Sequence, residues 1–177
     1  DDFVLPGMVH AAMLRSPHAH ARITRVNTEA ARNAPGVLAV YTGQDVSTAL
    51  KAVPCAWLLP NANLKIAVYE AICTQTVRYV GDIVAVVVAD TTYQAYDALD
   101  LIQVDYEPLP SVTDPELALR NGAPQLHADV PHNEAFHWVV AGGDVDAAFK
   151  NAEVVIKERI VQQRLIPHAM EARAALA

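Results

Sequence analysis

Histidines are the side chains of this chain best suited to metal binding. His18 and His20 lie two residues apart, so on a strand they would share one face and could hold a metal ion. No cysteine or carboxylate lies beside them, and they follow Ser16-Pro17, so we interpret them as a turn and surface pair. A second group recurs every five residues in a proline-rich stretch, a spacing that fits neither helix nor strand and predicts loop residues: His127, His132 and His137.

Acidic and nucleophilic residues occur without the partners that catalysis needs. Asp144 and Asp146 resemble paired carboxylates, but capping of the helix predicted after them explains them better. Four other acids are isolated in the sequence: Glu70, Asp82, Asp105 and Glu107. Two serines lie in predicted turns without the glycines of a nucleophile elbow: Ser16 and Ser111. Gly142-Gly143 lacks the surrounding signature of a phosphate-binding loop.

Cysteine usage and charge exclude several classes of function. Cys55 and Cys73 are the only cysteines, so no Cys-x-x-Cys pair exists for zinc, iron–sulfur or redox chemistry. A disulfide between them stays open, although a reduced, intracellular protein is the preferred interpretation. The net charge of −7 disfavours nucleic acid and anionic membranes as partners. The longest apolar run is too short for a membrane span, and the first residues lack the features of a signal peptide. The sequence therefore predicts a cytoplasmic protein.

The elements that position these residues centre on one apolar run. Ile83–Ala89 is rich in valine and is flanked by turn residues, which predicts a strand buried on both faces. Gly81 predicts a tight turn or bulge with positive φ before this strand. The segment Thr91–Leu99 predicts a short helix capped by Thr92. Its helical spacing predicts core positions for three larger side chains: Tyr93, Tyr96 and Leu99.

Other predicted elements flank this unit. Those before it are a strand at Met8–Arg15, an extended segment at His20–Val26, a helix within Asn27–Gly36 capped by Thr28, a strand at Val37–Tyr41, a turn at Thr42-Gly43 and a long excursion over 51–70. Those after it are a strand at Leu101–Tyr106 stopped by Pro108 and Pro110, an extended proline-rich segment with a helical patch at Pro115–Asn121, a helix at Val145–Asn151 and a partly solvated strand at Glu153–Gln163 with Val154, Ile156 and Ile160 on one face.

Four segments, taken in order, resemble one family. They are Gly7–Ile23 with Pro35-Gly36-Val37, the stretch Val77–Asp90 with the helix and strand that follow it, Gly143–Phe149, and Gln163–Ala177. Together they resemble the a/b-hammerhead domain that opens the large, molybdenum-carrying subunit of xanthine dehydrogenases, aldehyde oxidases and aerobic carbon monoxide dehydrogenases. The sequence of these segments is most similar to that of the bacterial carbon monoxide dehydrogenase-like large subunits.

The resemblance implies a fold and a division of the chain. The implied fold class is α+β, an a/b-hammerhead built from a mixed sheet and a few short helices. Residues 1–110 are expected to form the hammerhead core and 111–141 a proline-rich linker. Residues 142–177 are expected to hold the exit helix and the first strands of the molybdopterin-binding region.

The resemblance also implies a function that this chain does not perform alone. The full subunit would use a molybdenum–pterin cofactor to hydroxylate a substrate with oxygen from water or to oxidise carbon monoxide. Electrons would pass to iron–sulfur and flavin subunits or domains. The family's metal-facing glutamine, its Gly-Gly-Phe-Gly cofactor loop and its catalytic glutamate have no counterpart here, so the expected sets of catalytic, cofactor-binding and metal-binding residues in this chain are all empty. A stand-alone, non-catalytic assembly or binding module with the same fold is the alternative.

The last residues carry three further expectations. Where the family has proline after the Met-Glu pair, this chain has Ala172, which can adopt the same extended conformation. Glu171 lies at the start of the region that resembles the cofactor domain, where it could orient nearby loops or pair with Arg164 or Arg173. Met170–Ala177 resembles a strand whose sheet is missing, which predicts either a disordered tail or self-association through an open edge.

Overall fold

The structure is a computed structural model that describes residues 3–57, 63–166, 169–171 and 173–177. The chain divides into two units, and each is described by itself. The first is Leu5–His137, which contains both sheets, and the second contains Trp138–Ala177 together with the first residues of the chain. Each helix in the described part of the chain is too short or too polar to cross a membrane.

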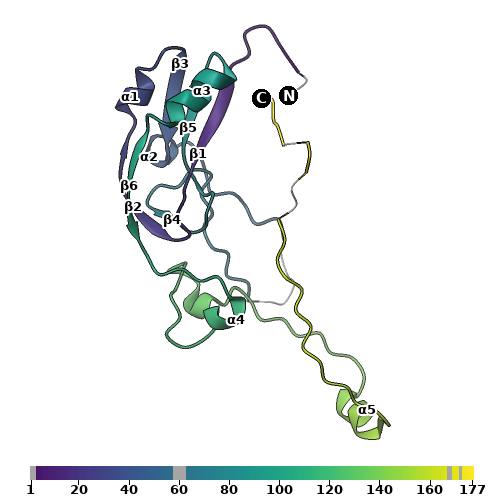
Figure 1. Cartoon of the computed structure of the whole chain (residues 1–177). Helices are drawn as coiled ribbons and strands as arrows, with labels where there is room; N and C mark the ends of the chain where they lie inside the picture. The colour runs from purple at the N-terminus through teal and green to yellow at the C-terminus, as the bar shows by residue number, and fades with distance from the viewer. Residues whose placement is uncertain (1–2, 58–62, 167–168, 172) are drawn as a thin grey trace. The chain divides into compact units, whose positions relative to one another are not determined.

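The central strand of the first unit is β5, Ile83–Ala89, which pairs with a neighbour along both edges. Its neighbours are β1, His10–Arg15, and β3, Val37–Thr42, and both pairings are antiparallel. Figure 1 shows the three strands side by side with α3 beside them. Val84, Ala85, Val87 and Ala89 of β5 are fully buried. The predicted strand is therefore confirmed in its bounds.

A second sheet forms from β2, Ala21–Asn27, β4, Thr76–Val77, and β6, Gln103–Pro108. Its order is β4-β2-β6, and both pairings are antiparallel. The strand after α3 thus joins a different sheet from the strand before it. Neighbouring strands joined through a crossover helix in one sheet would pair in parallel. Here α3 instead links β5 of one antiparallel sheet to β6 of the other. This arrangement belongs to the predicted α+β hammerhead class and specifies how its strands divide.

Five short helices and one 3₁₀ turn complete the described elements: α1 Glu29–Arg32, α2 Gly43–Val46, α3 Thr92–Leu99, α4 Pro115–Ala118, η1 Pro131–Asn133 and α5 Val145–Asn151. Thr91, not the predicted Thr92, caps α3, because its extended backbone lets its hydroxyl accept from the Gln94 N–H. Where a simple turn was predicted, Thr42 and Asp45 form a reciprocal capping box that starts α2. The Thr42 N–H that binds the Asp45 carboxylate holds the pKa of that carboxyl below its usual value.

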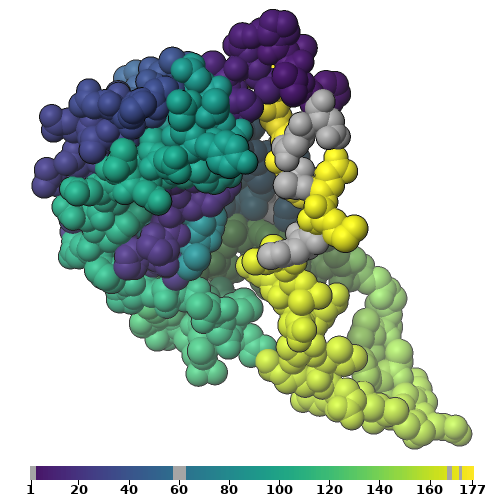
Figure 2. All heavy atoms as spheres, turned by 45° about the horizontal axis from the view of Figure 1, so that its top comes forward, coloured from purple at the N-terminus to yellow at the C-terminus, as the bar shows by residue number. Residues whose placement is uncertain are grey.

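The most deeply buried residues of α3 are small. Ala95 and Ala98 are 1% exposed and pack with Ala12, Val40 and Val87 in the main core. Tyr93 and Tyr96 are 84% and 61% exposed, so the prediction that they lie in the core is wrong. The fully buried positions of α3 are therefore alanines, while Leu99 is half-buried and packs against the same core, as predicted. The teal segment containing α3 accordingly lies at the surface of this unit in Figure 2.

The proline-rich segment after β6 is tied to the first unit at several points. Leu109 donates its N–H to the His20 carbonyl, 2.9 Å away, and the Arg78 side chain donates to the Leu126 carbonyl at 3.0 Å. Asn133 holds the segment together by donating to the carbonyls of Ala118 and Pro124. Residues 111–137 thus fold as turns and single helical turns as well as extended chain.

The second unit contains α5 and long irregular stretches. Of the two aspartates expected to cap α5, Asp144 and Asp146, it is Asp144 that accepts from the Ala147 N–H at 2.9 Å. The predicted strand at Glu153–Gln163 is wrong, because no neighbouring strand in the described chain supplies ladder hydrogen bonds, and Ile160 is 90% exposed. The described residues of Met170–Ala177 likewise form no strand, and Ala172 lies outside the described residues.

We predict that Gly81→Val destabilises the first unit by about 1–3 kcal/mol, because Gly81 has φ +98° as predicted from the sequence. An added Cβ there meets no atom within 4 Å, so the loss would come from the backbone alone. Gly81→Asn is the matched control, since asparagine tolerates positive φ better. Thermal unfolding should rank wild type, Gly81→Asn and Gly81→Val in that order. An unchanged melting temperature for the valine variant would contradict the strain.

We predict a second glycine effect at Gly43, which begins α2. A Cβ at this position would lie 2.3 Å from the Cys73 carbonyl oxygen. Alanine favours helices over glycine by roughly 1 kcal/mol, but overpacking against fixed backbone costs about 1–3 kcal/mol. Gly43→Ala should therefore lower the melting temperature. Gly142→Ala, where a Cβ meets nothing within 4 Å, should leave it unchanged, and equal behaviour of the two variants would refute the close contact.

Candidate functional site

The polar residues buried in the first unit gather where the turn before β5 meets the start of β2. Asp82 is 5% exposed, and its carboxylate accepts the Arg78 N–H at 3.0 Å. Its carbonyl accepts the Ser16 N–H at 2.8 Å. Cys73 lies beside it, and burial, followed by hydrogen bonding to Asp82, raises the pKa of the Cys73 thiol well above its usual value. A thiol held protonated in this way is a poor nucleophile, so the cluster stabilises the turn.

Two tyrosines close the exposed side of this turn. The hydroxyls of Tyr69 and Tyr79 hydrogen-bond to each other, and their rings stack with centroids 6.2 Å apart. Burial, then the hydrogen bond to Tyr69, raises the pKa of Tyr79. The Tyr79 hydroxyl therefore stays protonated at neutral pH, and its hydrogen bond to Tyr69 joins residues 69 and 79.

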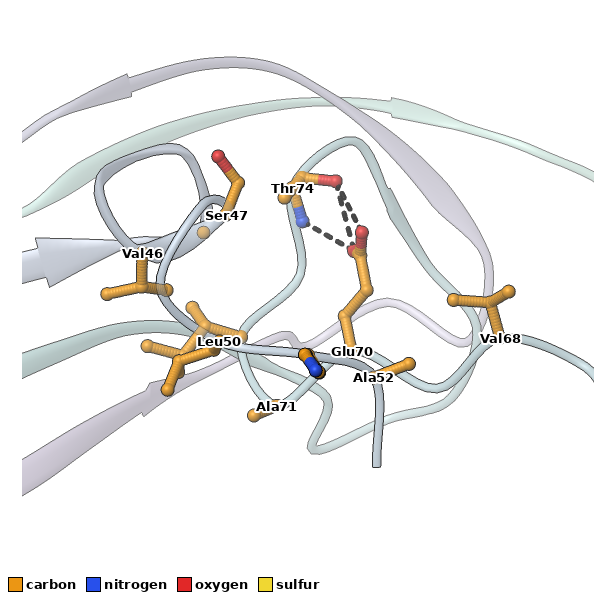
Figure 3. Close-up of a pocket in the computed structure, with 11 residues that line it drawn as sticks. Val46, Ser47, Leu50, Ala52, Val68, Glu70, Ala71 and Thr74 are labelled. Carbon is orange, nitrogen blue, oxygen red and sulfur yellow. Dashed lines mark hydrogen bonds between the residues drawn. The ribbon is translucent and has the colours of Figure 1, made fainter. Parts of the chain in front are cut away.

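A first cavity of about 200 Å³ lies between α2 and the chain around Glu70. Figure 3 shows the Glu70 carboxylate turned toward Thr74, whose N–H and hydroxyl both donate to it at 2.8 Å. Val46, Leu50 and Val68 supply apolar walls. Small-molecule sites occupy about 300–1,000 Å³, so this cavity is small for an organic cofactor, and its carboxylate already has two donors.

A second cavity, of about 390 Å³, is lined mainly by apolar side chains, among them Trp57, whose ring meets Phe136 edge to face at 5.4 Å. Its polar groups largely bind the chain itself. Asn133 accepts the Leu126 N–H in addition to its two donated bonds, and the Lys65 ammonium donates to the Glu134 carbonyl at 3.3 Å. The size suits a small ligand, but few polar groups remain to orient one.

The histidines divide between these surroundings. His20 is 8% exposed, and its Nδ1–H donates to the Pro110 carbonyl at 2.7 Å. The prediction that it lies on the surface is therefore wrong, because it anchors the end of β6. The His18 ring packs against Tyr106 with centroids 4.8 Å apart. His127 lines the second cavity, whereas His132 and His137 are exposed.

Metal ligation finds no support in this arrangement. Among the residues that the structure describes, no three histidines, cysteines or acids are placed to hold a metal ion. Both cysteines are free, with Cys73 buried and Cys55 exposed and lining the second cavity. The disulfide left open by the sequence is therefore absent.

Three acids predicted to be isolated have partners. Glu70 binds Thr74 and Asp82 binds Arg78, both at a separation of four residues, a signal that was present in the sequence. Glu107 forms an ion pair with Arg22 at 2.8 Å across β2 and β6. Because both side chains are more than half exposed, this pair adds little to stability. These acids serve the fold.

The comparisons place this fold in a family. Residues 1–110 match the model of the aldehyde oxidase and xanthine dehydrogenase a/b hammerhead domain. The chain belongs to this family, as the resemblance implied. The large chain of carbon monoxide dehydrogenase from Afipia carboxidovorans is 36% identical over 97% of this chain and 22% of its own length.

Solved structures agree with this assignment. A crystal structure of a Cu,Mo carbon monoxide dehydrogenase matches 87% of this chain and 20% of its own with TM-score 0.70 and 36% identity. Quinoline 2-oxidoreductase from Pseudomonas putida 86 matches 71% of this chain and 16% of its own with TM-score 0.66 and 41% identity. The chain therefore spans about one fifth of the length of these relatives.

We predict that His127 makes stability depend on pH. Burial, then the charge of Arg78 and to a lesser degree that of His20, lowers the pKa of His127 below its usual 6.5 against the opposing charge of Asp129. As pH falls through 6.5, the unfolded chain binds more protons at this residue than the folded chain, so the unfolding free energy decreases. His127→Leu should therefore lose less melting temperature between pH 7.5 and 5.5 than wild type.

His137→Leu is the control for this pH series, because it removes an exposed histidine from the same segment. It should keep the pH dependence of the wild type. Equal pH dependence of wild type and His127→Leu would show that the folded and unfolded states titrate alike at this residue.

Proposed function

We propose that this chain is the hammerhead portion of the large, molybdenum-binding subunit of a hydroxylase or dehydrogenase. The observation that carries the proposal is the match of residues 1–110 to the hammerhead model. Identity of 36% across 97% of the chain to a carbon monoxide dehydrogenase large chain supports it further. The reaction proposed for the whole protein is hydroxylation with oxygen from water, or oxidation of carbon monoxide.

The role proposed for residues 1–177 within that protein is structural. The described residues do not fit a molybdenum–pterin group, because Glu70, Asp82 and Asn133 are committed to internal hydrogen bonds and the larger cavity is mainly apolar. We therefore propose that the catalytic, cofactor-binding and metal-binding residues lie outside this chain. The purified chain should bind no molybdenum, iron or flavin, and stoichiometric metal in an elemental analysis would overturn this assignment.

The remaining features of the proposal follow from the family. The partners proposed are the remainder of the molybdenum-binding subunit and iron–sulfur and flavin subunits or domains, in the cytoplasm. Within the chain we propose a hammerhead core at 1–110, a linker at 111–141, and an exit helix with the first cofactor-domain segment at 142–177. The exit helix corresponds to α5.

A tagged copy of the gene in its native host tests this function. The tagged product should co-purify with about one molybdenum per polypeptide and with iron–sulfur and flavin polypeptides, and should reduce a dye with carbon monoxide, an aldehyde or an N-heterocycle. A tagged product without molybdenum would overturn the proposal. A product of about 177 residues that binds another protein without metal would favour the alternative, a non-catalytic assembly module.

We predict that the last residues are dispensable for the fold of the chain. Residues 165–177 contribute no strand among those described, and Leu165 and Ile166 are more than 70% exposed. Removal of 165–177 should leave the melting temperature unchanged, and it should convert any concentration-dependent oligomer to monomer, because an unpaired apolar tail favours self-association. Light scattering and thermal unfolding test both points. A large loss of stability would make the tail an integral part of the fold.

A further inference from the structure

The sheet β1-β5-β3 has an outer face opposite its core. Residues directly opposite each other on antiparallel strands share a face. The pairs Ala12↔Val87↔Val40 point inward, where all three residues are almost fully buried. The alternate pairs therefore point outward, and they form two rows that we call the outer patch: Ala11, Val88 and Ala39, and Met13, Val86 and Tyr41.

The outer patch is apolar although it is not covered by the helices. Met13 and Tyr41 are each 45% exposed, Ala11 is exposed, and the residues of β5 between them are half-buried. An antiparallel sheet with one face in water normally carries polar residues on that face. The six residues of the outer patch include no charge. The composition of the patch is thus that of a sheet face covered by protein.

The size of the outer patch decides which partner it fits. Three strands about 4.8 Å apart and two rows about 6.8 Å apart give an area of roughly 200 Å². A stable interface between separate molecules buries about 800 Å² on each partner. A second copy of this chain would therefore gain too little area here to offset the entropy lost on association.

A partner joined to the same polypeptide carries a smaller entropic cost, because the linkage keeps it at high effective concentration. This chain covers 22% of the carbon monoxide dehydrogenase large chain, so the rest of such a polypeptide is available as a partner. About four fifths of that relative lies outside the matched portion. An uncharged patch matches an apolar, uncharged surface of that remainder.

We propose that the outer patch is the surface by which this unit docks onto an apolar face of the rest of its own molybdenum-binding subunit. The inference rests on the proposed function and deepens it by assigning the contact surface to Met13, Tyr41 and their neighbours. Arg15 marks the border of the patch, where its guanidinium donates to the Gly81 carbonyl at 2.8 Å and reaches the Met13 sulfur at 3.8 Å.

The test compares a double variant of the patch with a matched control. Met13→Lys with Tyr41→Lys places two charges in the docking surface, and burying unpaired charge is costly. Tyr93→Lys with Tyr96→Lys changes two even more exposed aromatics on α3. Each pair is introduced into residues 1–177 alone and into the full product of the gene.

In residues 1–177 alone, both double variants should melt within a degree or two of wild type, because the changed side chains are exposed. In the full product, the patch variant should reduce the yield of molybdenum-loaded subunit at least tenfold, whereas the α3 variant should match wild type. Limited proteolysis should release the first unit from the patch variant alone.

The remaining outcomes separate the two proposals. A wild-type product that lacks molybdenum defeats the proposed function. A wild-type product that holds molybdenum, together with a patch variant that assembles equally well, defeats this inference and leaves the function standing. If residues 1–177 form a dimer and the patch substitutions dissociate it, the partner is a second copy of the chain. A rise in maleimide labelling of Met13→Cys on removal of residues 153–177 would make the chain's own tail the partner. Either result overturns the docking proposal.

Discussion

The central position of β5 is the constraint on which the rest of the first unit depends. The strand β5 pairs along both edges, which gives most of its backbone groups partners, and its inward residues form the middle of the core. The helix α3 follows directly and packs on the inner face through Ala95 and Ala98, and the chain then enters β6 in the second sheet. The crossover between the two sheets therefore begins at the central strand.

The polar residues that looked suited to chemistry hold the ends of strands together. Ser16 follows β1, Asp82 precedes β5, and their backbone hydrogen bond ties the ends of these two strands of the first sheet. His20 binds the Pro110 carbonyl and so ties the residues before β2 to those after β6 in the second sheet. Buried polar groups are tolerable when they are hydrogen-bonded, and no buried polar side-chain atom among the described residues lacks a partner. Full satisfaction leaves these groups poorly disposed to bind a substrate.

Local signals in the sequence were sufficient for some features and insufficient for others. The bounds of β5, the positive φ of Gly81 and the Asp144 cap each depend on a few neighbouring residues, and each was predictable. The burial of His20 was not, because its partner is 90 residues away. The exposure of Tyr93 was missed because helical spacing marks two possible faces, and the distance of the helix from the sheet decides between them.

The same reasoning explains why Glu153–Gln163 has the composition of a strand and no strand structure. A strand needs a neighbour for its backbone groups, as β5 has on both edges, and Val154, Ile156 and Ile160 have none among the described residues.

The outer patch lacks a covering layer in the same sense. Burying roughly 200 Å² of apolar surface contributes at most about 5 kcal/mol, which is comparable with the whole stability of a typical domain, about 5–15 kcal/mol. The buried core of this unit lies in two clusters that do not include the outer patch, and the patch offers enough apolar surface to hold the unit within a longer chain.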